Sequence, residues 1–368
     1  MIGRLLSQTN LELVGAQIIT PDEEFVKEYA DSLRVRAPKE ELELIADYVE
    51  RTLGPSNGRS HRSFLLLFRG ENPCQKLLSI CGPVYTRYME EDSKSAETIR
   101  ETYADMIFSK ENPTEVKFFE PAVLTPRRQE DADADLLRFA RFLDGKDNIV
   151  HNFRHPDPSK IERTLVILKP DNWKYNSSRP GAIIDMFSRT GLRIVGIKIH
   201  RFSLAQAMEF YSQVESGLIE RNVASFGVRE KEMLERAFEL TLSDEAASTL
   251  ASTLGKEKAK AQFGDIVEFM SGLRPGSCRP EDMQKPGSVK CMVLIYEGEN
   301  AVKKIREVLG PTDPLKAPIG TVRKEFGSNV MVNSAHASDS KESYEREKDV
   351  VKVNENFLVT IIRESIEG

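Results

Sequence analysis

The feature that most constrains the fold of this chain is an internal repeat. Residues 2–18, IGRLLSQTNLELVGAQI, align with residues 183–199, IIDMFSRTGLRIVGIKI. Residues 63–72, SFLLLFRGEN, align with residues 291–300, CMVLIYEGEN, and both matches keep their order along the chain. Matches of this kind indicate a duplicated structural unit. We therefore expect two copies of one domain.

Each copy has the pattern of a mixed α and β domain. In the second copy, GAIIDMFSRTG (181–191) has apolar residues at helical spacing, and LRIVGIKIHRF (192–202) alternates like a strand. Further strands are predicted at 162–171 and 290–298, and a helix at 299–310. The order β-α-β-(helices)-β-α-β is typical of the split βαβ plan. We expect an α+β chain of two ferredoxin-like (βαββαβ) domains in tandem, each with a mainly antiparallel sheet and helices on one face.

The domain boundaries follow from the two copies. The first domain, 1–126, begins at its first helix and lacks its first strand, because Met1 falls in the stretch that matches Ala182. Either the gene start is short or another segment fills that place, since natural sheets usually protect an open edge. A linker with an acidic start and a short helix covers 127–160. The second domain covers 161–368.

The linker carries two features that resemble metal sites. Its acidic run, EDADAD, lacks the central Gly and distal Glu of an EF-hand loop, so we do not expect calcium binding. His151 and His155 are four residues apart, but this segment carries two prolines. We interpret both histidines as solvated linker residues rather than metal ligands.

The second domain carries extra residues. Tyr29 and Ser63 are 34 positions apart, whereas the matching Tyr211 and Cys291 are 80 positions apart, an excess of 46. The extra residues belong to an insertion at about 217–288 that is helical at first and then a loop. Long insertions near active sites often serve as lids, so gating by this segment stays open.

Composition excludes several classes of protein. The net charge of -6 argues against a nucleic-acid coat or a membrane-surface protein, and no apolar run is long enough to span a membrane. The start of the chain has no secretory pattern, and the four cysteines form no C-x-x-C pair. We expect a cytoplasmic protein with structural thiols.

Polar residues suited to phosphate chemistry lie where elements of the second copy end. Lys169 ends a strand, Arg306 lies on a helix before LGPTDP, and Arg323 follows in GTVRKEF. Positioned cations stabilise the charge of a transferring phosphoryl group, and Arg donates two parallel hydrogen bonds to it. His336 lies in VNSAHASDS among small residues. Neutral imidazole, with an ordinary pKa of about 6.5, is a nucleophile near pH 7.

These residues belong to four landmarks, and through them the second copy resembles a nucleoside diphosphate kinase. The landmarks are KPD at 169–171, R-x-x-x-G-x-T-x-P at 306–314, GTVR at 320–323 and N-x-x-H-x-S-D-S at 333–340. The resemblance covers most of 162–349 apart from the insertion. It implies ping-pong phosphoryl transfer through a phosphohistidine, from a nucleoside triphosphate to a nucleoside diphosphate.

The resemblance also implies a role for each site residue. His336 would attack the γ-phosphate, Tyr211 would lie near that phosphate, and Ser338 and Glu347 would hold the histidine ring, with Glu347 fixing its tautomer. The nucleotide would be contacted by Lys169, Arg306, Thr312, Arg323 and Asn333, with Lys169 and Asn333 at the sugar or the transferring group. Mg²⁺ would bridge the phosphates and arrive with the nucleotide rather than in a protein cage.

Three departures from the family's pattern affect the surroundings of this site. Ala337 stands where the family commonly has Gly, and SSRPG (177–181) replaces the usual short basic link after KPD. The family stacks the base on a Phe in its helical lid, where the insertion falls, so Phe263 is only an ambiguous candidate for that role. Substrate range and rate are therefore less certain than the type of reaction.

The first copy has lost most of the landmarks. It has no KPD, Leu78 matches Arg306, and KFFEPAVL (117–124) places Glu120 where the nucleophile would stand. Arg100 survives in ETIRETY, which matches GTVRKEF. A carboxylate at that point would repel phosphates, so we expect this copy to act as a built-in partner that packs on the second copy as an internal pseudo-dimer.

Two functions remain open at this point. The leading hypothesis is an active kinase in the second copy, because the site residues are retained as a set. The alternative is a catalytically weak or inactive nucleotide-binding or scaffold protein, since fold alone does not fix function. The expected partners are nucleoside tri- and diphosphates, with no nucleic acid or membrane. Assembly into a homo-oligomer stays open.

Overall fold

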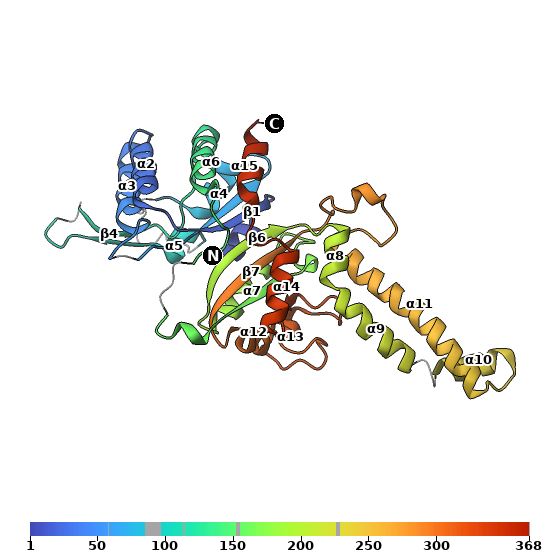
Figure 1. The fold of residues 1–368 in the computed structure, drawn as a ribbon. Helices are drawn as coiled ribbons and strands as arrows, with labels where there is room; N and C mark the ends of the chain where they lie inside the picture. The colour runs from blue at the N-terminus through green and yellow to red at the C-terminus, as the bar shows by residue number, and fades with distance from the viewer. Residues whose placement is uncertain (58, 85–96, 113–114, 152–154, 226–228, 368) are drawn as a thin grey trace.

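A computed structural model describes the chain except for residues 58, 85–96, 113–114, 152–154, 226–228 and 368 (Figure 1). The elements that precede the second predicted domain are α1 (Ile2–Ser7), β1 (Glu12–Ile19), α2 (Glu23–Arg34), α3 (Lys39–Thr52), β2 (Ser63–Arg69), α4 (Pro73–Cys81), α5 (Ile99–Tyr103), β3 (Asp105–Phe108), β4 (Val116–Glu120) and α6 (Gln129–Leu143). The remaining elements are β5 (Ile161–Leu168), α7 (Arg179–Ser188), β6 (Arg193–His200), α8 (Leu204–Phe210), α9 (Ser212–Ser225), α10 (Arg229–Phe238), α11 (Asp244–Ser271), β7 (Cys291–Glu299), α12 (Ala301–Leu309), α13 (Val322–Phe326), β8 (Ala335–Ala337), α14 (Lys341–Val350) and α15 (Phe357–Glu367). The chain is thus a mixed α and β fold.

Four strands of the C-terminal part form an antiparallel sheet in the order β6-β7-β5-β8. The predicted strands at 162–171, 192–202 and 290–298 correspond to β5, β6 and β7. The strand order and the crossing helices α7 and α12 match the predicted split βαβ plan. The short strand β8 pairs with the end of β5, with His336 opposite Ile167. This pairing places a reactive side chain at the edge of the sheet.

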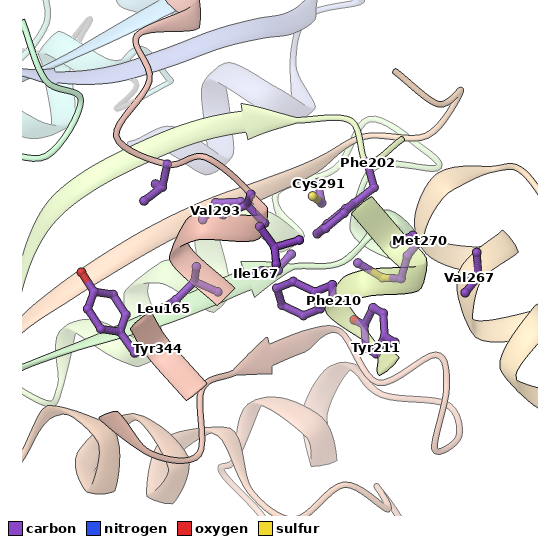
Figure 2. Packing of buried hydrophobic residues seen from close by; sticks show 14 of the residues in the cluster. Leu165, Ile167, Phe202, Phe210, Tyr211, Val267, Met270, Cys291, Val293 and Tyr344 are labelled. Atoms are coloured by element: carbon purple, nitrogen blue, oxygen red, sulfur yellow. The ribbon is translucent and has the colours of Figure 1, made fainter. Parts of the chain in front are cut away.

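Helices cover both faces of this sheet, so the prediction of helices on one face is wrong. On one face, Leu165 and Ile167 pack with residues of α8, α11 and α14, as Figure 2 shows for the labelled side chains. On the other face, Val166 and Leu168 pack with residues of α7 and α12. Successive strand residues point to opposite faces, so an unbroken apolar run such as LVIL needs cover on both sides.

The helices α9, α10 and α11 form a long arm that projects away from the sheet (Figure 1). Its base is buried against α8: Leu218, Phe263, Val267 and Met270 all belong to the core cluster on that face. The rest of the arm packs mainly within itself, α9 against α11. The arm therefore has a base that belongs to the domain core and a distal part that does not.

The N-terminal part contains two smaller sheets, β1 with β2 and β3 with β4. Helices α2 and α3 form a separate core with Phe119 of β4. Helix α15, near the C-terminus, packs mainly on α6 and β1, and Nζ of Lys198 on β6 lies 3.8 Å from the ring centroid of Phe357 at its start. The sequence patterns did not predict β3 or α15.

Local features recur at matching positions in the two parts. Strand β1 has a register shift just before Gly15, and β6 has one just before Gly196. Asn72 before α4 and Asn300 before α12 both have a left-handed backbone, with φ of 49° and 55°. In the alignment of the two copies these residues match in pairs.

A contact between an arginine and a glycine carbonyl recurs in the same way. Arg100 donates to the carbonyl of Gly82, and Arg323 donates to the carbonyl of Gly310 at 3.0 Å. A Cβ atom on Gly82 would meet Thr98, and one on Gly310 would meet Thr321. Both glycines also have positive φ angles, which explains why this turn requires glycine in each part.

The two parts meet through matching elements. Helix α1 lies against α7, and β1 lies against β6. Lys290 donates to the carbonyl of Leu13 at 3.2 Å, and Arg62 donates to the carbonyl of Ile194 at 2.6 Å. In the alignment Lys290 matches Arg62 and Ile194 matches Leu13, so each contact is the counterpart of the other.

One of the two linker histidines differs from its prediction. His155 is not solvated: its side chain is 15% exposed, and Nε2 lies 2.8 Å from Oε1 of the buried Glu297. His151 is exposed, and its Nδ1 lies 3.2 Å from Nη2 of Arg163. The sequence near His155 did not indicate its pairing with Glu297, because Glu297 lies on β7, far along the chain. Residues 152–154 of the predicted linker lie outside the described residues.

Candidate active site

His336 lies on β8 with a partly open side chain, which is 22% exposed. Its Nε2 is 3.0 Å from Oε1 of Glu347 on α14, although the ring N–H is not well aligned for a hydrogen bond. The other oxygen of Glu347 accepts a hydrogen bond from Ser338 at 2.7 Å. Glu347 and Ser338 are buried. A buried carboxylate on Nε2 favours the proton on that nitrogen and leaves Nδ1 as the nucleophile.

Lys169 lies at the end of β5, where Pro170 stops the strand. Its Nζ donates to Oδ1 of Asn333 at 2.7 Å and to the carbonyl of Met331 at 3.2 Å. Burial, and then the nearby charge of Arg323, lower the pKa of Lys169 to about 8. A lysine buried next to another cation is an arrangement that an incoming anion would stabilise.

Arg323 joins the site from α13. It donates to the carbonyls of Gly310 at 3.0 Å and Ala335 at 3.1 Å. Burial, and then the nearby Arg306, lower the pKa of Arg323 to about 10. Arg306 is exposed on α12. The two guanidinium groups and Lys169 thus concentrate positive charge on one side of the site.

The remaining predicted residues are placed in different ways. Thr312 is exposed, and its carbonyl, not its hydroxyl, accepts a hydrogen bond from Asn333 at 3.0 Å. Tyr211 is buried with its ring centroid 6.3 Å from that of His336, and its hydroxyl has no hydrogen-bond partner in the described part of the chain. Burial raises the pKa of Tyr211. The structure therefore brings all nine predicted residues around β8, with the Thr312 side chain facing outward.

Two aromatic residues lie at this site without having been singled out as part of it. The ring of Phe210 is 5.1 Å from the ring of His336, and the ring of Phe269 is 5.9 Å from Nζ of Lys169. Phe263, the ambiguous candidate for base stacking, is 5% exposed in the core at the base of the arm. Phe263 is therefore not presented to a ligand in this structure. The position of Phe210 next to Tyr211 in the sequence was a usable signal for its proximity.

The matching place in the N-terminal part is filled by the chain itself. Tyr29, Leu78, Val84 and Arg100, which match Tyr211, Arg306, Thr312 and Arg323, line a cavity of about 30 Å³. Arg36 enters the same place and binds Asp135 of α6 through two hydrogen bonds, at 2.6 and 2.9 Å. Glu120 does not take the position of His336, because β4 pairs with β3 and its carboxylate accepts from Tyr48 at 2.9 Å.

Among the residues placed by the structure, no group of three or more His, Cys, Asp or Glu side chains is arranged to hold a metal ion. In the same residues, no helix is both long and apolar enough to cross a membrane.

Comparison with known proteins identifies the family. The sequence profile described as Nucleoside diphosphate kinase matches residues 162–227 and 233–356. The nucleoside diphosphate kinase of Bdellovibrio bacteriovorus is 33% identical to this chain, over 51% of this chain and 89% of its own length. The enzyme of Paracoccus denitrificans is 34% identical, over 51% and 90%. Among solved structures, an NDP kinase from Pyrobaculum aerophilum is 25% identical over 53% of this chain and all of its own, with a TM-score of 0.36. The chain belongs to the nucleoside diphosphate kinase family.

Proposed function

We propose that this protein is an active nucleoside diphosphate kinase that works through phospho-His336. The observation that carries the proposal is the pair of His336 and Glu347 next to the buried Lys169 and the partly buried Arg323. The carboxylate orients the ring and stabilises the cation that forms on phosphorylation, while Lys169 and Arg323 neutralise phosphate charge. A protein that only binds nucleotide would not need an oriented nucleophile.

The reaction has two half-steps. Nδ1 of His336 attacks the γ-phosphorus of a nucleoside triphosphate, an N–P bond forms, and the bond from that phosphorus to the bridging oxygen breaks. The nucleoside diphosphate leaves with the bond's electron pair. In the second half-step, a terminal phosphate oxygen of another nucleoside diphosphate attacks the same phosphorus, and the N–P bond breaks. His336 returns as the neutral imidazole.

The surrounding residues bind and orient the nucleotide. Arg306 and Thr312 are exposed and would contact its outer phosphates, while Arg323 and Lys169 would contact the transferring group. Asn333 already joins Lys169 to the carbonyl of Thr312, which fixes the spacing between them. The buried Tyr211 hydroxyl, which has no partner in the described residues, would donate toward the γ-phosphate.

Mg²⁺ fits this site as a companion of the nucleotide. The charged groups that converge on the phosphates are cations, so Mg²⁺ would be held mainly by phosphate oxygens. It would neutralise their charge during transfer.

We further propose that residues 1–126 are a degenerate first copy of the domain that forms an internal pseudo-dimer with residues 161–368. The recurring register shifts, left-handed Asn residues and Arg–Gly contacts support a duplication. The reciprocal contacts of Arg62 and Lys290 support a pseudo-twofold relation, because in a twofold interface each contact occurs twice with the roles exchanged.

The first copy would serve as a structural partner. Its place for a nucleotide holds the ion pair of Arg36 and Asp135, and Leu78 and Val84 replace residues that bind phosphate in the second copy. The four cysteines are free thiols, which suits a reducing compartment such as the cytoplasm. Assembly of whole chains into a larger homo-oligomer is tested by light scattering.

Labelling separates the kinase from the nucleotide-binding scaffold. Wild-type protein incubated with γ-labelled ATP and Mg²⁺ should acquire acid-labile, base-stable label and pass it to added nucleoside diphosphate. His336→Ala should acquire none, while His151→Ala, which removes an exposed linker histidine, should label like wild type. Unlabelled wild type, or a labelled His336→Ala variant, contradicts the proposal.

A further inference from the structure

Arg179 connects three segments that meet at the candidate site. It lies in the first turn of α7, in the SSRPG stretch that departs from the family's pattern. Its Nη2 is 2.8 Å from Oδ2 of Asp171, 2.8 Å from Oγ of Ser334 and 2.6 Å from the carbonyl of Phe326. One guanidinium group therefore contacts the KPD turn, the end of α13 and the loop before β8.

Each of these segments carries a residue of the proposed site. The KPD turn begins with Lys169, α13 carries Arg323, and the loop before β8 leads from Asn333 to His336. Within the described part of the chain, Arg179 makes no hydrogen bond or ion pair with any of these four side chains. Its effect on the site must therefore pass through the residues it holds.

Ser334 is the residue through which that effect is largest. It is fully buried, and its φ angle of 72° is left-handed, which is unfavourable by about 1–2 kcal/mol for a residue with a side chain. Its carbonyl accepts hydrogen bonds from the backbone of Lys169 at 2.9 Å and from Nδ2 of Asn172 at 2.6 Å. Its hydroxyl accepts from Arg179.

The conformation of Ser334 decides where its neighbours point. Asn333 and His336 lie on either side of it, and the left-handed turn directs Asn333 to Lys169 while β8 directs His336 to Glu347. A relaxed backbone at Ser334 would rotate one of these side chains relative to the other. Strain of this kind persists only where surrounding contacts enforce it.

We propose that Arg179 is a positioning residue that holds Ser334 in its left-handed conformation and thereby sets the spacing of Lys169, Asn333 and His336. The role in catalysis rests on the proposed function, whereas the effect on the geometry of His336 does not. Arginine suits the position because its side chain is one bond longer than that of lysine and carries Nη2 to the point where the three acceptors meet, which a lysine ammonium would not reach.

The test combines a change at Arg179 with glycine at Ser334. Arg179→Lys keeps a positive charge near the buried Asp171, so the protein should still fold, but it loses the three-way contact. We expect kcat to fall about 10–100-fold with a smaller change in KM, because small displacements of reacting groups have effects of this size. Ser334→Gly alone should stay within about threefold of wild type, because glycine adopts the left-handed conformation without strain.

The double variant decides the mechanism. Arg179→Lys with Ser334→Gly should recover to within about threefold of Ser334→Gly, because glycine no longer needs the arginine to hold its backbone. A matched control, Arg363→Lys, changes an arginine that pairs with Asp144 at 2.7 Å far from the site and should leave kcat unchanged. Arg179→Lys activity equal to this control, or no recovery in the double variant, overturns the proposal.

A second readout is independent of phosphoryl transfer. The rate at which diethyl pyrocarbonate modifies His336, measured by peptide mass spectrometry, should change in Arg179→Lys and return in the double variant. If the wild-type protein transfers no phosphate but the variants still show these changes in the modification rate, the positioning role is supported and the proposed function fails. An unchanged modification rate in Arg179→Lys overturns the positioning role even if the enzyme is active.

Discussion

At the scale of single residues, the site is organised around cations that are buried at a cost. Lys169 is enclosed among polar partners, yet burial and Arg323 lower its pKa to about 8. An ordinary lysine in the unfolded chain titrates near 10.4. The folded protein therefore holds a charged Lys169 at neutral pH against an unfavourable environment. An anionic ligand would relieve that cost, which is the usual arrangement of a site that is completed by its ligand.

This cost predicts how stability depends on pH. Between pH 8 and about 10.4 the unfolded state binds more protons at this lysine than the folded state, so the free energy of unfolding rises with pH in that window. The rise from Lys169 should be at most about 3 kcal/mol, at about 1.4 kcal/mol per pKa unit. Lys169→Met should lack this part of the rise, as measured by denaturant unfolding at a series of pH values.

Lys198 provides the internal reference for this measurement. Burial also lowers its pKa, to about 7, so it contributes a similar rise in both the wild type and the variant. The difference between the two curves therefore isolates Lys169. Parallel curves from pH 8 to pH 10 would contradict the assignment of the lowered pKa to Lys169.

The residues of the candidate site differ in how far the sequence could predict them. His336, Lys169 and Arg323 could be singled out together because they match the landmarks of the nucleoside diphosphate kinase pattern; their position at the ends of strands and helices alone was only suggestive. The roles of Arg179 and Ser334 were not, because a left-handed serine and a three-way contact depend on how distant segments pack. The sequence could not predict the burial of Phe263 for the same reason, because that burial depends on how the base of the arm packs on the domain core.

At the scale of elements, the arm of α9, α10 and α11 separates into two parts with different consequences. The backbone of Val223 on α9 passes close to Gly255 on α11, since a Cβ on Gly255 would lie 3.0 Å from Val223 Cα. The two helices can therefore be joined there by a short loop, as in other helical hairpins. Beyond this point the arm packs mainly on itself.

Shortening the arm should leave the domain intact. When residues 225–252 are replaced by a four-residue Gly/Ser loop, we expect the free energy of unfolding of the protein to change by less than about 1 kcal/mol. Phosphoryl transfer should stay within about twofold, because the distal arm projects away from the sheet (Figure 1). Chemical denaturation and steady-state rates measure both quantities.

A substitution at the base of the arm supplies the contrast. Phe263→Ala should lower the free energy of unfolding by about 3–5 kcal/mol, because it opens a cavity in the core. If the shortened arm and Phe263→Ala lower the free energy of unfolding equally, the division of the arm into a core base and an independent distal part is wrong. A large loss of activity in the shortened protein would instead favour the lid function that the sequence left open.

The elements themselves were predicted unevenly. Strands β5, β6 and β7 and helices α7 and α12 follow from local periodicity, so the sequence was sufficient for them. The sequence did not predict that helices cover both faces of the sheet. A short apolar run is compatible with a strand buried on one face or on both, and only the positions of the neighbouring helices distinguish the two cases. Helix α15 ends the chain on a surface made by α6 and β1, which no local pattern could indicate.

At the scale of the whole molecule, the two parts share two of their buried clusters. Leu6 and Leu13 of the first part belong to the same buried cluster as Ile183 and Leu294 of the second. Ile362 of α15, which is fully buried, packs in a cluster with residues of β1, β2 and α6. Neither part can expose these surfaces to water without losing much of its apolar burial. The parts should therefore unfold together rather than as independent domains.

Probes that belong to each part can test this cooperativity. Trp173, the only tryptophan of the chain, reports on the second part by fluorescence, and the buried thiols of Cys74 and Cys81 report on the first part by their reactivity. In wild type, both signals should change at the same denaturant concentration. Ile362→Ala should lower the free energy of unfolding by about 2–5 kcal/mol and move both midpoints down together.

The control and the contradicting outcome follow from the same geometry. Val35→Ala changes an aliphatic residue of the first part that is 85% exposed. It should change the free energy of unfolding by less than about 0.5 kcal/mol and leave both midpoints nearly in place. If the thiols of Ile362→Ala react at lower denaturant while the Trp173 transition stays in place, α15 stabilises only the first part. Coincident shifts would instead establish α15 as the element through which the C-terminal part depends on its N-terminal partner.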